Sequence, residues 1–491
     1  MKKPNIVFFL ADQMRCDSMA HMGNTAAKTP NLDSLLEDGV SFCHAYCQNP
    51  VSVPSRCSFL SGFYPHTTGH RTMHFLQRPD EKNLLRIMKE QGYEVIWIGR
   101  NDVIPANRAK TEYCDEFYNE VDFINHRDDE GLKFKPGFVN AKSPEFMEKD
   151  GFYSFYKGKL DKEEASVNGD WNCIKNALNY LERKSRSPEE KPFFLYITLS
   201  FPHPPYGCEE PWFESIDRNN LPPRRADVET LAGKPSMLQS IRSKQNLTSW
   251  TEEQYNELRA VYLGMVERFD YQFGMIKDCL KKFNMYDNTS IFVFSDHGDY
   301  TGDYGITEKV QNCFEEPISN VPLLIKPASG FTVKPGKTEV LAELLDIPAT
   351  VAEMTGIQLG YVQFGKSLLG AVAGDKVHRD AVFCEGGRIH GEIQAMETGH
   401  GPESPYWPRL SSQCSEGPEH CKAVMIRDIR YKYVMRLYEQ DEFYDLQEDP
   451  MELSNQIENF KYKSEIERLR MRLLRFYMET TDTVPMERDP R

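Results

Sequence analysis

The sequence lacks a surplus of positive charge. Its 491 residues include 59 Lys plus Arg and 74 Asp plus Glu, which gives a formal net charge of −15. A protein that binds nucleic acids or anionic membranes through its overall charge needs a basic surface. The composition therefore argues against a nucleic-acid partner and against a membrane partner. Hydrophobic residues make up 40% of the chain, enough for a globular protein to bury a large core.

Paired cysteines and long hydrophobic runs are also missing. The 12 cysteines do not repeat a C-x2-C spacing, which argues against a zinc ribbon and a disulfide scaffold and indicates free thiols in a reducing compartment. The apolar run at residues 6–11 is too short for a secretory signal, and no later run reaches the length of a membrane span. We therefore expect a cytoplasmic protein. The sequence leaves its oligomeric state open.

Four short apolar runs predict buried parallel strands, at residues 6–11, 94–98, 193–199 and 290–295. Segments with apolar residues at helical spacing lie between them, at residues 83–91, 171–183 and 252–283. Strands that alternate with helices are typical of an α/β fold. We expect a large, mainly parallel sheet that is sandwiched by helices.

The composition changes at about residue 370. A Gly- and Pro-rich stretch at residues 386–421 predicts a long irregular loop, residues 423–435 predict two short strands around a turn, and residues 463–478 predict a helix. We expect a catalytic domain at residues 1–370 and a smaller C-terminal α+β subdomain, with an antiparallel sheet, at residues 371–491.

Charged or metal-binding side chains follow each of the four predicted strands directly: Asp12 and Gln13, Arg100, His203, and Asp296 with His297. Ligand sites in α/β folds lie beyond the carboxyl ends of the strands, so we expect these residues at one edge of the sheet. Carboxylate oxygens favour a hard divalent cation, whereas a pure zinc site would have more His or Cys.

The most specific motif is the segment 52–62, SVPSRCSFLSG. It predicts a turn that enters a helix, with Ser52 in the position of a nucleophile and Arg56 able to hold an anion. The segment resembles the signature of the sulfatase family at every specified position: Cys or Ser, any residue, Pro, Ser, Arg, three residues, Leu, Ser or Thr, Gly. Further segments match this family in its own order: residues 5–7 with Asp12, 29–33, 201–205, 296–298, Lys309 before 322–325, 346–350, and 443–446 with 449–450.

The resemblance implies an alkaline-phosphatase-like fold, a bound Ca²⁺, and a formylglycine made from Ser52 by a maturase. The residues that would hold the metal are Asp12, Gln13, Ser52, Asp296 and His297. Gln13 stands where many members of the family have a second Asp. This departure also resembles the phosphonate monoester hydrolase branch, which makes Mn²⁺ or another divalent metal the alternative to Ca²⁺.

The resemblance also assigns catalytic roles. The cations expected around the sulfuryl oxygens are Arg56, Arg100, His203 and Lys309. An aldehyde hydrate would attack sulfur, the alcohol would leave with a proton from His or Lys, and the second hydroxyl would expel sulfate. Residues 99–102 lack the family's histidine that assists recovery of the aldehyde, and His70 is the candidate substitute.

Three functions remain open from the sequence. The leading one is a sulfuric ester hydrolase that acts on a sulfated carbohydrate or an aryl sulfate. The first alternative is a phosphonate monoester hydrolase or phosphodiesterase. The second is a non-catalytic anion binder with an unmodified Ser52, because one serine hydroxyl cannot complete the cycle. The sequence also leaves open whether Ser52 is native or replaces a cysteine.

Overall fold

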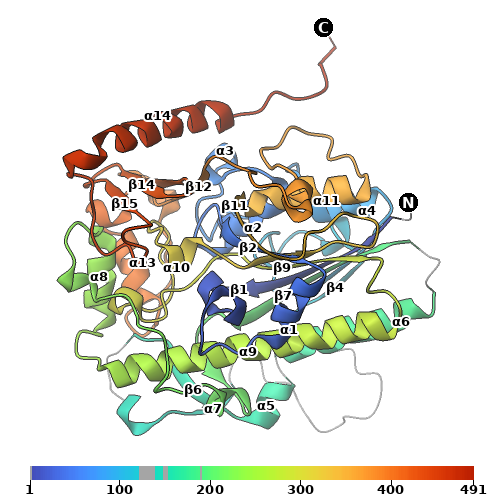
Figure 1. Cartoon of the computed structure of the whole chain (residues 1–491), viewed down its shortest axis with the longest axis horizontal. Coiled ribbons are helices and arrows are strands. Elements are labelled where there is room, and N and C mark those ends of the chain that lie inside the picture. Colours follow the sequence, from blue (N-terminus) through green and yellow to red (C-terminus); the bar gives the residue numbers. More distant parts are fainter. Residues whose placement is uncertain (1–2, 121–138, 148–152, 168, 188–190, 491) are drawn as a thin grey trace.

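The computed structural model describes residues 3–120, 139–147, 153–167, 169–187 and 191–490. An eight-stranded sheet forms its centre, in the order β11-β2-β10-β9-β1-β7-β3-β4 (Figure 1). β10 is antiparallel to both of its neighbours and all other neighbours pair in parallel, which confirms the predicted mainly parallel sheet. Its strands are β1 (Asn5–Asp12), β2 (Val40–Tyr46), β3 (Glu94–Gly99), β4 (Glu116–Tyr118), β7 (Phe193–Pro202), β9 (Thr289–Ser295), β10 (Leu323–Lys326) and β11 (Gly336–Glu343).

Helices cover both faces of this sheet. The helices are α1 (Pro30–Ser34), α2 (Ser52–Ser61), α3 (Pro65–Thr68), α4 (Leu84–Glu90), α5 (Lys162–Ser166), α6 (Asp170–Ser185), α7 (Trp212–Ser215), α8 (Ser236–Gln245), α9 (Glu252–Lys282), α10 (Glu316–Ser319), α11 (Ile347–Thr355), α12 (Leu369–Ala373), α13 (Trp407–Gln413) and α14 (Lys463–Thr480). Residues of α1, α6 and α9 share one core cluster, and residues of α2, α4 and α11 share another. The three helices predicted from apolar spacing correspond to α4, α6 and α9.

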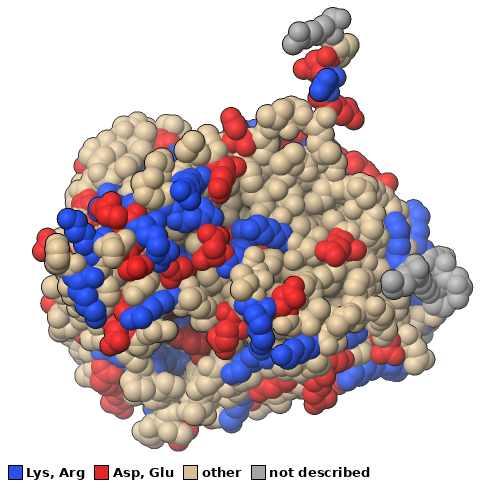
Figure 2. All heavy atoms as spheres, turned by 45° about the horizontal axis from the view of Figure 1, so that its top comes forward, with Lys and Arg blue, Asp and Glu red and all other residues tan. Residues whose placement is uncertain are grey.

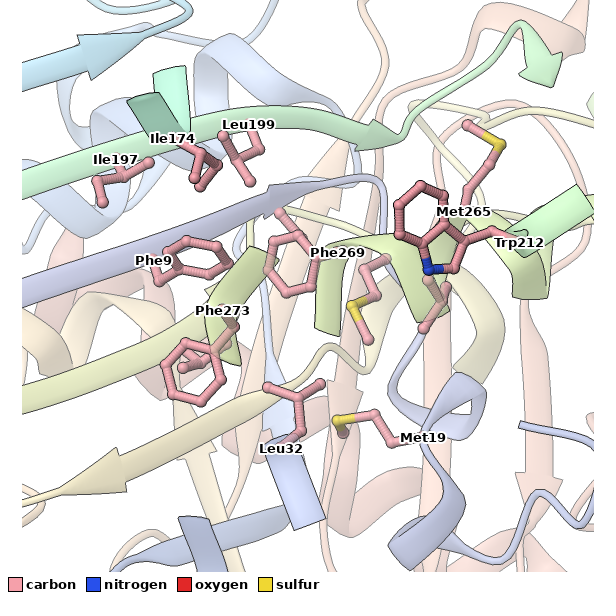
Figure 3. Packing of buried hydrophobic residues seen from close by; sticks show 14 of the residues in the cluster. Phe9, Met19, Leu32, Ile174, Ile197, Leu199, Trp212, Met265, Phe269 and Phe273 are labelled. Carbon is pink, nitrogen blue, oxygen red and sulfur yellow. The ribbon is translucent and has the colours of Figure 1, made fainter. Parts of the chain in front are cut away.

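Strand β1 connects the two cores. Side chains of a strand point to alternate faces, so Val7 and Phe9 pack under α9, while Phe8 and Leu10 pack on the opposite face. Phe9 lies against two phenylalanines of α9, with ring centroids 4.8 Å from Phe269 (Figure 3). Burial on both faces explains why this strand reads as a continuous hydrophobic run.

The C-terminal region contains a second, antiparallel sheet in the order β12-β13-β14-β15. Its strands are β12 (Val382–Gly386), β13 (Ala423–Arg427), β14 (Tyr431–Arg436) and β15 (Glu442–Asp445). Helix α14 packs on it through Leu469, Leu473 and Phe476. The small antiparallel sheet is therefore confirmed, whereas the boundary at residues 370 and 371 stays a prediction.

Two features differ from the sequence-based expectation. The stretch 386–421 is not wholly irregular, because α13 forms within it, and Pro408 near the start of that helix is compatible with the first turn. A third sheet, β5-β6-β8, was not predicted. Its strands are β5 (Ala141–Lys142), β6 (Tyr156–Leu160) and β8 (Tyr206–Cys208), which are too short to give an alternating pattern.

The surface does not present a uniformly basic face in Figure 2, where Lys and Arg are interspersed with Asp and Glu. Among the described residues, no helix combines the length and the apolar character needed to cross a bilayer.

Replacing Phe9 with Ala should test the central core. Phe9 is fully buried, so Phe9→Ala removes a ring from a packed site and should lower the free energy of unfolding by about 3–5 kcal/mol. Urea denaturation followed by circular dichroism would measure the loss. Phe460→Ala, at a side chain that is 82% exposed, is the matched control and should change stability little. Equal effects of the two variants would contradict the described core.

Candidate active site

The carboxyl ends of β9, β1, β7 and β3 lie at one edge of the central sheet. The register pairs Ala11 of β1 with Ser295 of β9, and Gly99 of β3 with Thr198 of β7. Asp12 pairs with Pro202, the last residue of β7. The segments that follow the four strands therefore begin side by side at this edge of the sheet, as the strand pattern predicts.

Asp12, Asp296 and His297 form a buried cluster of candidate metal ligands. One ligand atom from each lies within 4.8 Å of the others. His297 Nδ1 lies 3.0 Å from the Gly298 carbonyl, which assigns the proton to Nδ1 and leaves the lone pair of Nε2 3.7 Å from both carboxylates. Asp12 Oδ1 is buried and accepts no hydrogen bond from any described residue. A divalent cation would satisfy the unpaired Asp12 oxygen and would bind the Nε2 lone pair of His297, so these residues fit such an ion.

Neighbouring charges set the protonation states in this cluster. Burial alone would raise the pKa of Asp12, but the neighbouring cations Arg56, Arg100 and Lys309 outweigh it and lower that pKa well below its ordinary value. Burial lowers the pKa of His297, so its imidazole is neutral near pH 7. An ionised carboxylate and a neutral imidazole are the states in which these groups bind a cation.

Arg56 connects the two carboxylates from within α2, and its side chain is fully buried. Its Nε donates a hydrogen bond to Asp296 Oδ2 at 2.8 Å, and its Nη2 donates to Asp12 Oδ2 at 2.8 Å. Its Nη1 donates to no described residue and lies 3.7 Å from Asp102 Oδ2. Arg56 thus orients both carboxylates and keeps donor capacity for an anion.

Ser52 is the first residue of α2, and every residue of this helix is buried. Its Oγ lies 2.9 Å from His297 Nε2, so the signature serine touches the candidate metal cluster directly. One turn further on, Ser55 Oγ donates a hydrogen bond to the Asp296 carbonyl at 2.6 Å. The motif therefore positions its serine by packing α2 against the segment that follows β9.

Lys309 is buried and has three close polar neighbours. It donates hydrogen bonds to Gln13 Oε1 at 2.8 Å and to His203 Nε2 at 2.9 Å, and it forms an ion pair with Glu308 Oε1 at 3.1 Å. Because His203 Nε2 accepts from Lys309, its proton belongs on Nδ1, which lies 2.6 Å from the Pro204 carbonyl. Burial, reinforced by the charge of Lys309, lowers the pKa of His203 well below its ordinary value.

Gln13 bridges Lys309 and a carboxylate that the sequence interpretation missed. Its Nε2 donates to Asp299 Oδ2 at 2.6 Å, and its backbone N–H donates to Asp296 Oδ1 at 3.2 Å. Tyr206 donates to the same Asp299 carboxyl group at 2.8 Å. The position of Asp299, three residues after Asp296, is the local signal that would have found it. Tyr206 lies on β8 and carries no such signal.

The structure brings Arg100 to this cluster, since its Nη1 donates to Asp12 Oδ2 at 2.9 Å. It places His70 in a different environment. The His70 ring contacts Glu81 Oε2 at 2.7 Å and the Phe75 carbonyl at 2.8 Å, which engages both nitrogens. A role for His70 in recovery of the aldehyde therefore stays a prediction, without a contact to support it.

Comparisons with known proteins agree with the signature. The family model described as Sulfatase matches residues 4–357. The chain is 26% identical to a sulfatase of Formosa agariphila, over 95% of this chain and 86% of the relative. It is 24% identical to an arylsulfatase of Clostridium perfringens, over 96% of this chain and 94% of the relative.

Solved structures share the fold. A phosphonate monoester hydrolase of Agrobacterium radiobacter has a TM-score of 0.78 at 22% identity, covering 97% of this chain and 96% of its own. A second structure, in complex with its substrate D-glucosamine-2-N,6-O-disulfate, has a TM-score of 0.72 at 18% identity, covering 99% of this chain and 100% of its own.

Asp296→Ala should abolish metal binding, because it removes one carboxylate from the buried cluster. After dialysis against Ca²⁺ and removal of excess ion, the Asp296→Ala variant should retain almost none of the metal that the unaltered protein retains, as measured by atomic emission. Its far-ultraviolet circular dichroism should be largely unchanged. Asp445→Ala removes a carboxylate that pairs with Arg430 at 2.7 Å in the C-terminal sheet, and it should keep the metal content of the unaltered protein. Full metal content in Asp296→Ala would refute the assignment.

Proposed function

The chain belongs to the sulfatase family of sulfuric ester hydrolases, in the alkaline phosphatase superfamily, and we propose that it releases inorganic sulfate from a sulfated carbohydrate or an aryl sulfate. One observation carries the proposal: the signature residues Ser52 and Arg56 directly contact the Asp12, Asp296 and His297 cluster. A nucleophile position, an anion-binding cation and a metal-ligand cluster in mutual contact are what hydrolysis of a charged ester requires.

The residues that would hold the metal are Asp12, Gln13, Ser52, Asp296 and His297. Ca²⁺ is the proposed ion because oxygen ligands predominate, and the His297 nitrogen makes Mn²⁺ or another divalent ion the alternative. When bound, the ion supplies a positive charge that stabilises negative charge on a sulfuryl oxygen. Gln13 already accepts a hydrogen bond from Lys309, and its amide oxygen has a second lone pair for a ligand role.

Ser52 is the residue proposed to be converted to formylglycine by a maturase. A hydrated aldehyde supplies two hydroxyl groups, one for attack on sulfur and one for release of sulfate, whereas a serine supplies only one. The burial of Ser52 and its contact with His297 fix the position from which that attack starts. Burial of this position also limits the access of bulk water.

The cations around Ser52 are suited to bind the sulfuryl oxygens. Arg56 Nη1 is a buried donor that makes no hydrogen bond to any described residue, with Asp102 Oδ2 3.7 Å away, which makes it the first candidate for one oxygen. Arg100 and Lys309 add two further positive charges at the same centre. Such preorganised charges act more strongly in a buried site than in water, since less solvent screens them.

The Lys309–His203 pair is proposed to protonate the departing alcohol. Lys309 holds its proton 2.9 Å from His203 Nε2, in a geometry that allows proton transfer between the two side chains. The lowered pKa of His203 makes its protonated form a strong acid once formed. The fixed Nδ1 contact to the Pro204 carbonyl keeps Nε2 as the exchanging nitrogen.

A phosphonate monoester hydrolase or phosphodiesterase is the second candidate. Gln13 supports it, because the pair Asp12 and Gln13 with Asp296 and His297 resembles that branch of the superfamily. A solved phosphonate monoester hydrolase also shares the fold. Relative turnover of phenyl phosphonate esters and aryl sulfates by the matured protein separates the two candidates.

The maturation of Ser52 is directly testable. Co-expression with a serine-type maturase should remove about two hydrogens from the tryptic peptide that contains Ser52, because oxidation of the alcohol to an aldehyde loses one H₂. Peptide mass spectrometry after trypsin digestion would detect the change. Ser55 lies in the same tryptic peptide, so fragment ions that separate the two serines should place the loss at Ser52 and show Ser55 unmodified. An unchanged peptide mass would refute the formylglycine proposal.

Sulfate release by matured protein tests the reaction itself. Turnover of 4-nitrophenyl sulfate should be readily measured by ion chromatography of sulfate, and Lys309→Ala should reduce kcat by about 10²-fold or more through loss of the proton donor. Lys281→Ala, on the last turn of α9, is the control and should keep the rate of the unaltered protein.

Binding without sulfate release from aryl and saccharide sulfates would contradict the proposal and favour a non-catalytic anion binder. Faster turnover of phosphonate esters would favour the second candidate.

A further inference from the structure

A cavity of about 350 Å³ is lined by α9, by the segment that follows β1 and by residues 301 and 303, which follow β9. This volume lies within the range of small-molecule sites, about 300–1,000 Å³. Of the described residues that line the cavity, none is assigned above to catalysis or to the metal. The cavity is therefore separate from the proposed catalytic centre.

Part of the cavity wall is apolar. The apolar side chains are two methionines, one leucine and three prolines: Met22, Met451, Leu263, Pro222, Pro223 and Pro450. They come from four different segments of the chain and meet only in the folded protein. Such a wall favours the apolar part of a ligand, because contact with it removes apolar surface from water.

The charged part of the wall has a surplus of one positive charge. Among the described residues, the charged groups that line the cavity are three arginines, Arg15, Arg225 and Arg259, and two aspartates, Asp17 and Asp303. Arg15 pairs with Asp17 at 2.7 Å and with Asp303 at 2.8 Å, and Arg225 pairs with Asp303 at 2.8 Å. Arg15 and Arg225 therefore already balance both carboxylates.

Two of the arginines keep capacity for an anion. The Nε atom of Arg225 is buried and makes no hydrogen bond to any described residue. Arg259 is partly buried and donates to the Pro222 carbonyl and to Asn256 Oδ1, both neutral acceptors, and it pairs with no carboxylate in the described part of the chain. Burial lowers the pKa of Arg259 below its ordinary value, and the charge of Asp303 does not compensate.

We propose that this cavity binds a small organic monoanion, with a carboxylate at Arg225 and Arg259 and an apolar body against the methionine and proline wall. Arginine donors match the planar geometry of a carboxylate, and hydrogen bonds between charged groups are stronger than neutral ones. The surplus of one positive charge is suited to a ligand with a single negative charge. The proposal does not depend on the proposed sulfatase function.

The cavity shares two residues with the network around Gln13. Tyr262 lines the cavity, and its hydroxyl donates to the Gln13 carbonyl at 2.9 Å. Thr301 also lines it, and its hydroxyl donates at 2.8 Å to Asp299, the carboxylate that accepts from the Gln13 amide. A ligand in the cavity would therefore lie against residues that hold Gln13 and Asp299 in place.

Calorimetric titration of the full chain, without maturation and without metal, tests the site. We expect 2-naphthoate to bind at one site and 2-naphthamide, which has the same shape without the charge, to bind at least about 10-fold more weakly. Arg259→Gln should weaken the binding of 2-naphthoate by at least about 10-fold and change that of 2-naphthamide by less than about 3-fold. This substitution leaves no carboxylate without a partner. Arg475→Gln, at an exposed arginine of α14, is the matched control and should bind both compounds as the unaltered protein does.

Two further variants locate the bound anion. Met22→Trp adds bulk to the apolar wall at a partly buried position and should weaken both compounds. Lys309→Ala, in the proposed catalytic centre, should keep the affinity for 2-naphthoate, and a loss of 10-fold or more would place the anion there and overturn the proposal. Equal affinities for the acid and the amide, or no saturable binding of 2-naphthoate, would also overturn it. None of these outcomes bears on sulfate release by the matured protein.

Discussion

The buried ion pairs of Arg56 with Asp12 and Asp296 are the interaction on which the proposed catalytic centre depends. Both carboxylates lie at ends of neighbouring strands, and one guanidinium holds them at 2.8 Å each. Taking three charges out of water is costly, and removal of one partner would leave an uncompensated buried charge. Such a cluster is weak evidence for stability. Its consequence here is geometric, because it fixes α2, and with it Ser52, against β1 and β9.

Backbone strain accompanies this arrangement. Gln13 has a φ of 70° and Glu308 has a φ of 69°, a region that side chains other than glycine rarely adopt. The turn at Gln13 directs its backbone N–H to Asp296 and its amide to Lys309. The turn at Glu308 places the carboxylate between Lys309 and Arg409. Both strained residues therefore contact Lys309, Gln13 through its amide oxygen and Glu308 through its carboxylate. The surrounding contacts stabilise the strained backbone.

The sequence predicted those parts of the centre that have a local signal. Apolar runs located β1 and β9, so Asp12 and Asp296 followed as strand-end residues, and a contiguous motif identified Ser52. Residues joined only by tertiary contact had no such signal. Arg409 is 101 positions from Glu308 in a stretch predicted to be irregular, and its role depends on where α13 packs.

The electrostatic balance of the centre explains how an acidic protein can bind an anionic ester. Asp12 pairs with Arg56 and Arg100, Asp296 pairs with Arg56, and Glu308 pairs with Lys309. Two further carboxylates, Asp102 and Glu120, pair with the same arginines, so the cluster itself carries no surplus of positive charge. A divalent cation held by Asp12 and Asp296 would add two positive charges to it. The overall charge is −15, and salt screens the charges exposed elsewhere on the surface beyond a Debye length of about 8 Å. With that ion bound, its two positive charges would offset Asp12 and Asp296. The donor at Arg56 Nη1, together with Arg100 and Lys309, would then attract an anion locally.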